Sequence, residues 1–504
     1  MKVLNQENTG ELDKRTMKFL GISSFQLMEK AVYALYRQLK DTVKDVDRPF
    51  VILAGSGNNG GDGIGLARLL SEDGHIVELY YCDYAQPTDE NSKMRSKLPR
   101  MKYLTESTIH SESDFPNLPN NSIVIDAIFG NGINRPLSGL WLHLVKHVNS
   151  HSESVTVISI DIPSGLHPDS WYGTEAVKAD FTFTIGQPKK SFFYSESGEY
   201  TGEWDIVDIG LSYSETKDLH TNLFYVTKAL VQSSVNLKRK KFSHKGIYGH
   251  ALLINGSYGK MGAAILAARS SLRSGVGLLT CHVPKIGYPI MQISVPEAMV
   301  SVDDHDYYFH SCIDTQKYSA IGIGSGIDHR SGVEEALLYI LKQSKKPLVL
   351  DADALNIIAS KEDWIQAIPA DSIITPHPGE FRRLFGSWES DEEKLNIQLT
   401  ISKEHHIYIV LKGAHTSIST PDGRIFFNST GNPGMATPGS GDTLTGILTS
   451  FRAQGIPPLA ACLTGVYLHG MAGDLASKDK GEISLISSDI IDYLGSAFQD
   501  TFGY

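Results

Sequence analysis

The chain alternates short, continuously apolar runs with glycine-rich or polar loops and helix-like segments along most of its length. The runs are rich in β-branched residues, as a parallel strand buried on both faces requires. They span residues 50–54, 76–80, 122–125 and 155–160, and then 251–254, 276–279, 320–323, 348–350, 373–374 and 407–411. Because strands that alternate with helices form βαβ units, the sequence predicts an α/β protein with doubly wound sheets.

The strand pattern divides into two arrays. The first ends near residue 211, and a polar, charged stretch precedes the second array. We therefore expect two domains, residues 1–222 and 223–504. With 41% hydrophobic and 20% charged residues, both can bury a sizeable core.

Composition limits the partners and the compartment. The formal net charge of −11 argues against nonspecific nucleic-acid binding. No apolar run approaches the ~18 residues of a membrane span, and the N-terminus lacks the apolar segment of a signal peptide. The four cysteines lie far apart, which indicates a reducing compartment. We expect a cytoplasmic protein that binds neither nucleic acid nor membrane.

A glycine-rich segment, GSGNNGGDG at residues 55–63, follows the first predicted strand and leads into a helical pattern from residue 64. Glycines let a backbone approach a ligand closely and present N–H groups to phosphate at a helix N-terminus. The segment also satisfies GxGxxG, so a nicotinamide dehydrogenase is one alternative and a turn without a ligand is another.

Two further loops follow predicted strands of the first array, DAIFGNGINRP from Asp126 and DIPSGL from Asp161. Ligands bind at the carboxyl ends of strands in doubly wound sheets. Either aspartate could instead be a helix N-cap. Asn59, Asp126 and Ser164 offer hard oxygen ligands that suit a hard cation.

Together these motifs resemble the NAD(P)HX epimerase domain of the bifunctional NAD(P)H-hydrate repair enzymes, over roughly residues 1–211. The resemblance implies a Rossmann-like domain that binds NADHX or NADPHX, with Asp161 as the catalytic carboxylate at the nicotinamide ring. It implies K⁺ bound at Asn59, Asp126 and Ser164. Asn131 stands where the family more often has threonine. The implied substrate-binding residues are Asn58, Asn59, Gly60, Gly61, Asp62, Gly130, Asn131, Gly132, Ile133, Asn134, Arg135, Pro136 and Asp161.

In the second half, GSGD at residues 439–442 precedes an apolar helical pattern. Small residues at a helix start leave N–H groups free to bind developing negative charge. Asp442 is then either an N-cap or a catalytic base. Lys412 follows the predicted strand 407–411 and suits nucleotide phosphates, whereas His377, in a turn after strand 373–374, could be structural.

These features resemble the ribokinase-like fold and, over roughly residues 230–500, the ADP-dependent NAD(P)H-hydrate dehydratases. No GxxxxGK[ST] motif occurs, so the sequence does not predict a P-loop enzyme. The resemblance implies that Asp442 is the catalytic base, that ADP is the co-substrate and that Mg²⁺ accompanies its phosphates. It implies hydrate contacts at Ala263, Gly326, His377 and Asp442, and nucleotide contacts at Lys412, Gly413, Ala414, His415, Thr416 and Gly441.

The favoured hypothesis is a metabolite-repair enzyme that epimerises R and S NAD(P)HX and dehydrates the S form with ADP, giving AMP and phosphate. We expect a homo-oligomer. Two alternatives remain besides the dehydrogenase. One is a ribokinase-like kinase of a hydroxymethyl or sugar substrate with an allosteric first domain, and the other is a first domain that serves only as a scaffold.

Overall fold

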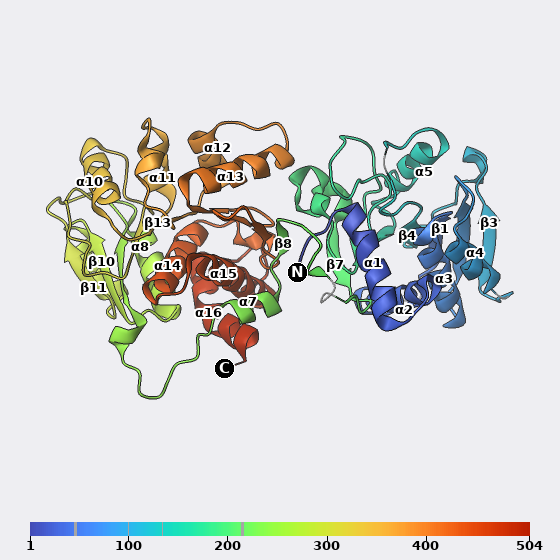
Figure 1. Cartoon of the computed structure of the whole chain (residues 1–504), viewed down its shortest axis with the longest axis horizontal. Helices are drawn as coiled ribbons and strands as arrows, with labels where there is room; N and C mark the ends of the chain where they lie inside the picture. Colours follow the sequence, from blue (N-terminus) through green and yellow to red (C-terminus); the bar gives the residue numbers. More distant parts are fainter. Residues whose placement is uncertain (45–47, 99, 134, 213–215, 504) are drawn as a thin grey trace. The chain divides into compact units, whose positions relative to one another are not determined.

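The computed structural model describes residues 1–44, 48–98, 100–133, 135–212 and 216–503. The chain divides into two compact units, residues 2–221 and residues 222–504 together with Met1 (Figure 1). We call them the N-terminal and C-terminal units. Met1 belongs to the second because it exchanges two backbone hydrogen bonds with Tyr225, of 2.8 and 2.9 Å.

Seven parallel strands form the sheet of the N-terminal unit, in the order β3-β2-β1-β4-β5-β6-β7. Its strands are β1 (Phe50–Gly55), β2 (Val77–Cys82), β3 (Leu104–Thr108), β4 (Ile123–Ala127), β5 (Thr156–Ile160), β6 (Phe181–Ile185) and β7 (Glu203–Val207). Its helices are α1 (Gln6–Leu20), α2 (Ser24–Thr42), α3 (Asn58–Glu72), α4 (Asp89–Ser96), α5 (Gly139–Asn149) and α6 (Gly198–Thr201).

Alternate side chains of β1 enter two different cores. Phe50 and Ile52 join a core with residues of α2 and α3, whereas Val51 and Leu53 join a core with residues of α5. Helices therefore cover both faces, which explains why the strand is continuously apolar.

The strand order reverses between β1 and β4, because β2 and β3 lie on one side and β5 to β7 on the other. Connections diverge at such a switch point and leave a crevice at the carboxyl ends of the strands. The glycine-rich segment after β1 and the loop after β4 flank this crevice.

The C-terminal unit has a ten-stranded sheet in the order β11-β10-β9-β12-β13-β14-β15-β16-β17-β8. The run from β11 to β15 is parallel, β16 is antiparallel to both of its neighbours, and β8 is parallel to β17. The strands are β8 (Leu223–Tyr225), β9 (His250–Ile254), β10 (Leu278–Val283), β11 (Met299–Val302), β12 (Ala320–Ile323), β13 (Leu348–Leu350), β14 (Ile373–Ile374), β15 (Tyr408–Leu411), β16 (Ser417–Ser419) and β17 (Ile425–Phe427).

Helices cover both faces of this sheet as well (Figure 1). One face carries α10 (Ser331–Gln343), α11 (Ala352–Ala359), α12 (Pro378–Phe385) and α13 (Asp391–His405). The other carries α7 (Lys228–Ser234), α8 (Met261–Arg273), α14 (Ser440–Ala453), α15 (Pro458–Lys480) and α16 (Ser487–Phe502). The short α9 (Gly287–Ser294) follows β10. The strand order reverses between β9 and β12, which places a second crevice there.

The predicted α/β class is confirmed in both units. The predicted strands after residues 50, 76, 122 and 155 correspond to β1, β2, β4 and β5. The edge strands β3 and β7 were not predicted, because they are partly exposed and therefore lack a continuous apolar run. Among the described residues, no helix has both the length and the apolar character needed to cross a membrane.

Candidate active sites

The glycine-rich segment is the start of a helix rather than a loop before one. Helix α3 begins at Asn58, six residues before the predicted start, with Gly57 as its N-cap. A Cβ on Gly60 would lie 1.8 Å from the carbonyl oxygen of Gly55, and one on Gly61 would lie 2.8 Å from Met28. Gly60 and Gly61 therefore allow α3 to pack closely on β1 and α2.

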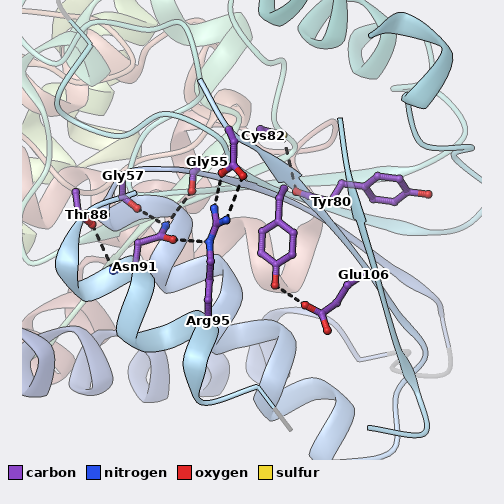
Figure 2. Close-up of polar contacts among 10 residues, drawn as sticks. Gly55, Gly57, Tyr80, Cys82, Thr88, Asn91, Arg95 and Glu106 are labelled. Atoms are coloured by element: carbon purple, nitrogen blue, oxygen red, sulfur yellow. Dashed lines mark hydrogen bonds and ion pairs between the residues drawn. The ribbon is translucent and has the colours of Figure 1, made fainter. Parts of the chain in front are cut away.

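Asn91 of α4 fixes the backbone of this segment (Figure 2). Its Nδ2 donates to the carbonyl oxygens of Gly55 at 2.9 Å and Gly57 at 2.8 Å, and Arg95 Nε donates to its Oδ1 at 2.8 Å. Asn91 is fully buried, so these bonds are shielded from water. Asn91 was not predicted, because nothing in its local sequence pattern distinguishes it from a surface asparagine.

Replacing Asn91 by Ala is expected to lower the free energy of unfolding by about 2–3 kcal/mol, because the backbone carbonyls of Gly55 and Gly57 lose their donor in a buried place. The Michaelis constant of the N-terminal site for its substrate should rise as the glycine-rich segment loosens. Urea unfolding and steady-state kinetics measure the two effects. Ser92→Ala, an exposed change on the same helix, is the matched control, and equal effects of both changes would contradict this role.

Asp126 and Ser164 are joined at the carboxyl ends of β4 and β5. Asp126 accepts hydrogen bonds from the Ser164 hydroxyl at 2.5 Å, the Ser164 backbone N–H at 2.8 Å and the Ser159 hydroxyl at 2.8 Å. Burial raises the pKa of Asp126, although these hydrogen bonds act in the opposite direction. Asp126 lies within β4 and is no helix N-cap, so that alternative is wrong.

Asn59 points into the same region. Its Nδ2 donates to the Phe129 carbonyl oxygen at 3.0 Å, and the Ser164 Oγ is 3.3 Å from the same oxygen. The Oδ1 of Asn59 is buried without a hydrogen-bond partner. A buried amide oxygen without a donor is costly, and a bound cation would satisfy it.

Asp161 occupies a strained and charged position. Its φ of 67° lies in the left-handed region, which costs energy in a residue with a side chain. Its Oδ1 accepts from Lys189 Nζ at 2.6 Å and from the Ile185 N–H at 3.0 Å. Its Oδ2 accepts from Asn131 Nδ2 at 2.6 Å, so the asparagine that departs from the family pattern contacts the predicted catalytic group.

Two further carboxyl groups, on Asp13 and Asp62, lie near Asp161. Burial and then the charges of Asp161 and Asp13 raise the pKa of Asp62 well above its ordinary value. Burial and the charge of Asp161 raise the pKa of Asp13 to about 6. Lys189 pairs directly with Asp161 at 2.6 Å, and its charge also acts on Asp13, where it opposes the rise in pKa. Asp13 and Lys189 were not predicted, because they come from α1 and from the loop after β6.

The raised pKa of Asp13 makes stability depend on pH. The folded state holds this proton more tightly than the unfolded chain, so the free energy of unfolding falls as pH rises from about 4 to about 6. Asp13→Asn removes this cost, which is roughly 2–3 kcal/mol at neutral pH. The variant should therefore melt at a higher temperature than the wild type at pH 7, and the difference should vanish below pH 4. A difference in melting temperature between variant and wild type that stays the same over this pH range would contradict the raised pKa of Asp13.

A cavity of about 700 Å³ joins these groups. The predicted site residues that line it are Asn58, Asn59, Asp62, Gly130, Asn131, Gly132, Ile133, Arg135, Pro136 and Asp161. Gly60 and Gly61 are buried behind it, and Asn134 lies outside the described residues. One wall is aromatic, since Tyr84 stacks on Phe129 at 4.5 Å and meets Trp141 at 6.3 Å between ring centroids.

In the C-terminal unit, Lys412 is held at the carboxyl end of β15 by Asp351, at 2.9 Å. The second carboxylate oxygen of Asp351 accepts from the Thr445 hydroxyl of α14 at 2.9 Å. Burial acts to raise the pKa of Asp351, but the charge of Lys412 holds it below its ordinary value. A Cβ on Gly441 would lie 3.2 Å from Lys412 Nζ, so the backbone of the glycine turn lies directly against this ion pair.

Asp442 is the third residue of α14, whose N-cap is Gly439 with a φ of 89°. The N-cap interpretation of Asp442 is therefore wrong. Burial and the charge of Asp351 raise its pKa. A carboxylate with a raised pKa in the first turn of a helix can act as a general base.

A pocket of about 400 Å³ opens at the β9/β12 switch point. It is lined by Gly259, Lys260, Gly262, Ala263, Gly326, Asp353 and Asp442. Three predicted hydrate contacts, Ala263, Gly326 and Asp442, thus come together although they are far apart in sequence.

The fourth predicted hydrate contact, His377, stays a prediction, and its side chain also has a structural role. It is the N-cap of α12, and its Nδ1 accepts from the N–H groups of Gly379 at 3.0 Å and Glu380 at 3.4 Å. It does not line the pocket.

The predicted nucleotide loop, Lys412 to Thr416, connects β15 with β16. Its Gly413 and Ala414 are exposed. The loop turns on itself, because the Thr416 hydroxyl donates to the Gly413 carbonyl oxygen at 3.1 Å. The loop therefore presents the solvent-exposed backbone of Gly413 and Ala414 beside Lys412, where a phosphate could bind.

Each α/β unit has carboxylates near the switch point of its sheet, an arrangement typical of enzymes that bind nucleotide-like ligands. Family models place the chain further: the YjeF-related protein N-terminus matches residues 24–191, and NAD(P)H-hydrate dehydratase matches residues 251–495. The bifunctional NAD(P)H-hydrate repair enzyme Nnr of Moorella thermoacetica is 33% identical over 98% of this chain and 96% of its own length. That of Thermofilum pendens is 32% identical over 99% and 96%. The chain therefore belongs to the bifunctional NAD(P)H-hydrate repair enzymes, with an epimerase and a dehydratase domain.

A solved structure is similar to the second unit. The ADP/ATP-dependent NAD(P)H-hydrate dehydratase of Bacillus subtilis, co-crystallised with ATP and Mg²⁺, is 31% identical with a TM-score of 0.51, and the match covers 56% of this chain and 100% of that one. The predicted ribokinase-like fold of the C-terminal unit is confirmed. Family membership sets aside the dehydrogenase and the scaffold.

Proposed function

We infer that the N-terminal unit interconverts the R and S forms of NADHX and NADPHX, and that the C-terminal unit dehydrates the S form with ADP. The observation that carries the second activity is the convergence of Asp442, Ala263 and Gly326 in one pocket beside the Lys412–Asp351 pair. Fusion of the two activities suits this division, because the first unit supplies the epimer that the second consumes.

In the dehydratase, Asp442 takes the proton of the hydroxyl on carbon 6. The resulting oxygen attacks the terminal phosphorus of ADP, and AMP leaves. The phosphate then leaves carbon 6 with its bonding electrons, and loss of a proton from carbon 5 restores the double bond of the dihydropyridine. Phosphate is a better leaving group than hydroxide, which is why a nucleotide is consumed. Lys412 and the N–H groups at the start of α14 stabilise charge on the moving phosphoryl group.

Mg²⁺ would neutralise charge on the phosphates. Among the described residues, no group of three or more histidine, cysteine, aspartate or glutamate side chains is arranged to hold a metal ion. We therefore assign the ligands of Mg²⁺ mainly to ADP.

In the epimerase, Asp161 transfers the proton that inversion at carbon 6 requires. Inversion breaks and re-forms a bond at this carbon, whether the ring opens or water departs, and both routes need proton transfer. Lys189 and Asn131 orient the carboxylate. We assign K⁺ to Asn59, Asp126 and Ser164, because the Asn59 Oδ1 lacks a donor; there the ion would order the loops around the substrate. We also infer a cytoplasmic homo-oligomer.

Product stoichiometry tests the dehydratase step. Purified protein with S-NADHX, ADP and Mg²⁺ should give NADH, AMP and inorganic phosphate in equal amounts. A phosphorylated hydrate that accumulates as a stable product would instead indicate a ribokinase-like kinase.

A further inference from the structure

Two exposed tyrosines of the C-terminal unit form a pair, and one of them is adjacent in sequence to residues that line the pocket. Tyr258 and Tyr307 are 67% and 51% exposed, although large aromatic side chains are costly to leave in water. Their rings meet edge to face with centroids 5.4 Å apart. The Tyr258 N–H donates to the Tyr307 carbonyl oxygen at 2.8 Å, which joins the two loops.

The loop that carries Tyr307 is fixed in place by the buried Asp303. This carboxylate accepts from the N–H groups of His305, His310 and Ser311 at 2.8 to 3.0 Å, and it pairs with the buried His282 at 2.8 Å. The tyrosine pair is therefore preorganised, and little ordering entropy would be lost when a ligand stacks on it.

The position of the pair relates it to the hydrate. Tyr258 directly precedes Gly259 and Lys260, which line the pocket together with Asp442. A pocket of about 400 Å³ is near the small end of the range for drug-sized ligands, and a dinucleotide is larger. Because the hydrated ring must reach Asp442, the far end of the dinucleotide has to extend past the rim.

We propose that Tyr258 and Tyr307 form an aromatic platform that binds the adenine base of the hydrated dinucleotide. Planar bases stack on exposed aromatic side chains, and this contact tolerates the absence of specific hydrogen bonds. The platform rests on the proposed dehydratase function and adds a second binding point far from the reacting carbon. It favours the complete dinucleotide over the corresponding mononucleotide.

The test compares S-NADHX with the S hydrate of reduced nicotinamide mononucleotide, which lacks the adenosine half. Replacing both tyrosines by Ala should lower kcat/KM for S-NADHX roughly 10-fold or more and leave kcat/KM for the mononucleotide hydrate and the KM for ADP unchanged. Replacing both by Phe should preserve the preference for the dinucleotide. Tyr339→Ala, at an exposed tyrosine of α10, is the control.

In the double Ala variant, an equal loss of kcat/KM with both hydrates, no loss with either, or a raised KM for ADP would overturn the proposed platform. A wild-type protein that dehydrates neither hydrate would overturn the platform together with the proposed function. That result is distinct, because it concerns the wild type rather than the variant.

Discussion

Asp442→Asn should abolish dehydration of S-NADHX while epimerisation of R and S continues. Loss of a general base lowers kcat by about 10²–10⁴, and an amide cannot take the hydroxyl proton. The change keeps the size of the side chain at a pocket wall, so ADP should still bind with similar affinity. Release of NADH gives the rate of dehydration. Interconversion of the two hydrates, monitored by chromatography, gives the internal control.

The pH profile adds a second readout for the wild type. Burial and the charge of Asp351 raise the pKa of Asp442, and a base acts only when ionised. Dehydration should therefore increase with pH through a limb that lies above the ordinary range of aspartate. Equal loss of both activities in Asp442→Asn, or unchanged dehydration, would contradict the two-site assignment.

Asp161→Asn should leave the R hydrate unconsumed while the S hydrate is still dehydrated. The side chain loses its charge, and its amide nitrogen must face either Lys189 or Asn131, which both donate to Asp161 in the wild type. We expect epimerisation to fall by about 10²–10⁴.

Stability has to be separated from catalysis in this variant. Lys189 is only 2% exposed and would lose its ion pair with residue 161, and breaking a buried ion pair costs about 3–5 kcal/mol. The double change Asp161→Asn with Lys189→Met removes both charges and should recover the melting temperature but not epimerisation. Recovery of R consumption in the double variant would show that Asp161 is not the catalytic group.

The features that could be predicted from the sequence are those that a local pattern of residues encodes. Buried parallel strands are continuously apolar, so β1, β4 and β9 could be recognised, and so could the aspartates at the ends of β4 and β5. The carboxyl ends of parallel strands share one edge, which is why Asn59, Asp126 and Ser164 were expected together.

Contacts between distant elements could not be predicted. Lys189 and Asp13 reach Asp161 only through the folded positions of α1 and the loop after β6. His377 was predicted from a motif of the resembled family, and only the folded structure shows that it also caps α12. The start of α3 was predicted six residues late, because glycines disfavour helices in isolation, whereas close packing on β1 requires them here.

The central claim is that one chain holds both activities and that ADP drives the second. The most direct measurement is the recovery of reduced-nicotinamide absorbance from a mixture of R and S NADHX, with Mg²⁺, in the presence and absence of ADP. Complete recovery that depends on ADP is the predicted result. Recovery that stops at the S fraction, or recovery without any nucleotide, would contradict the account.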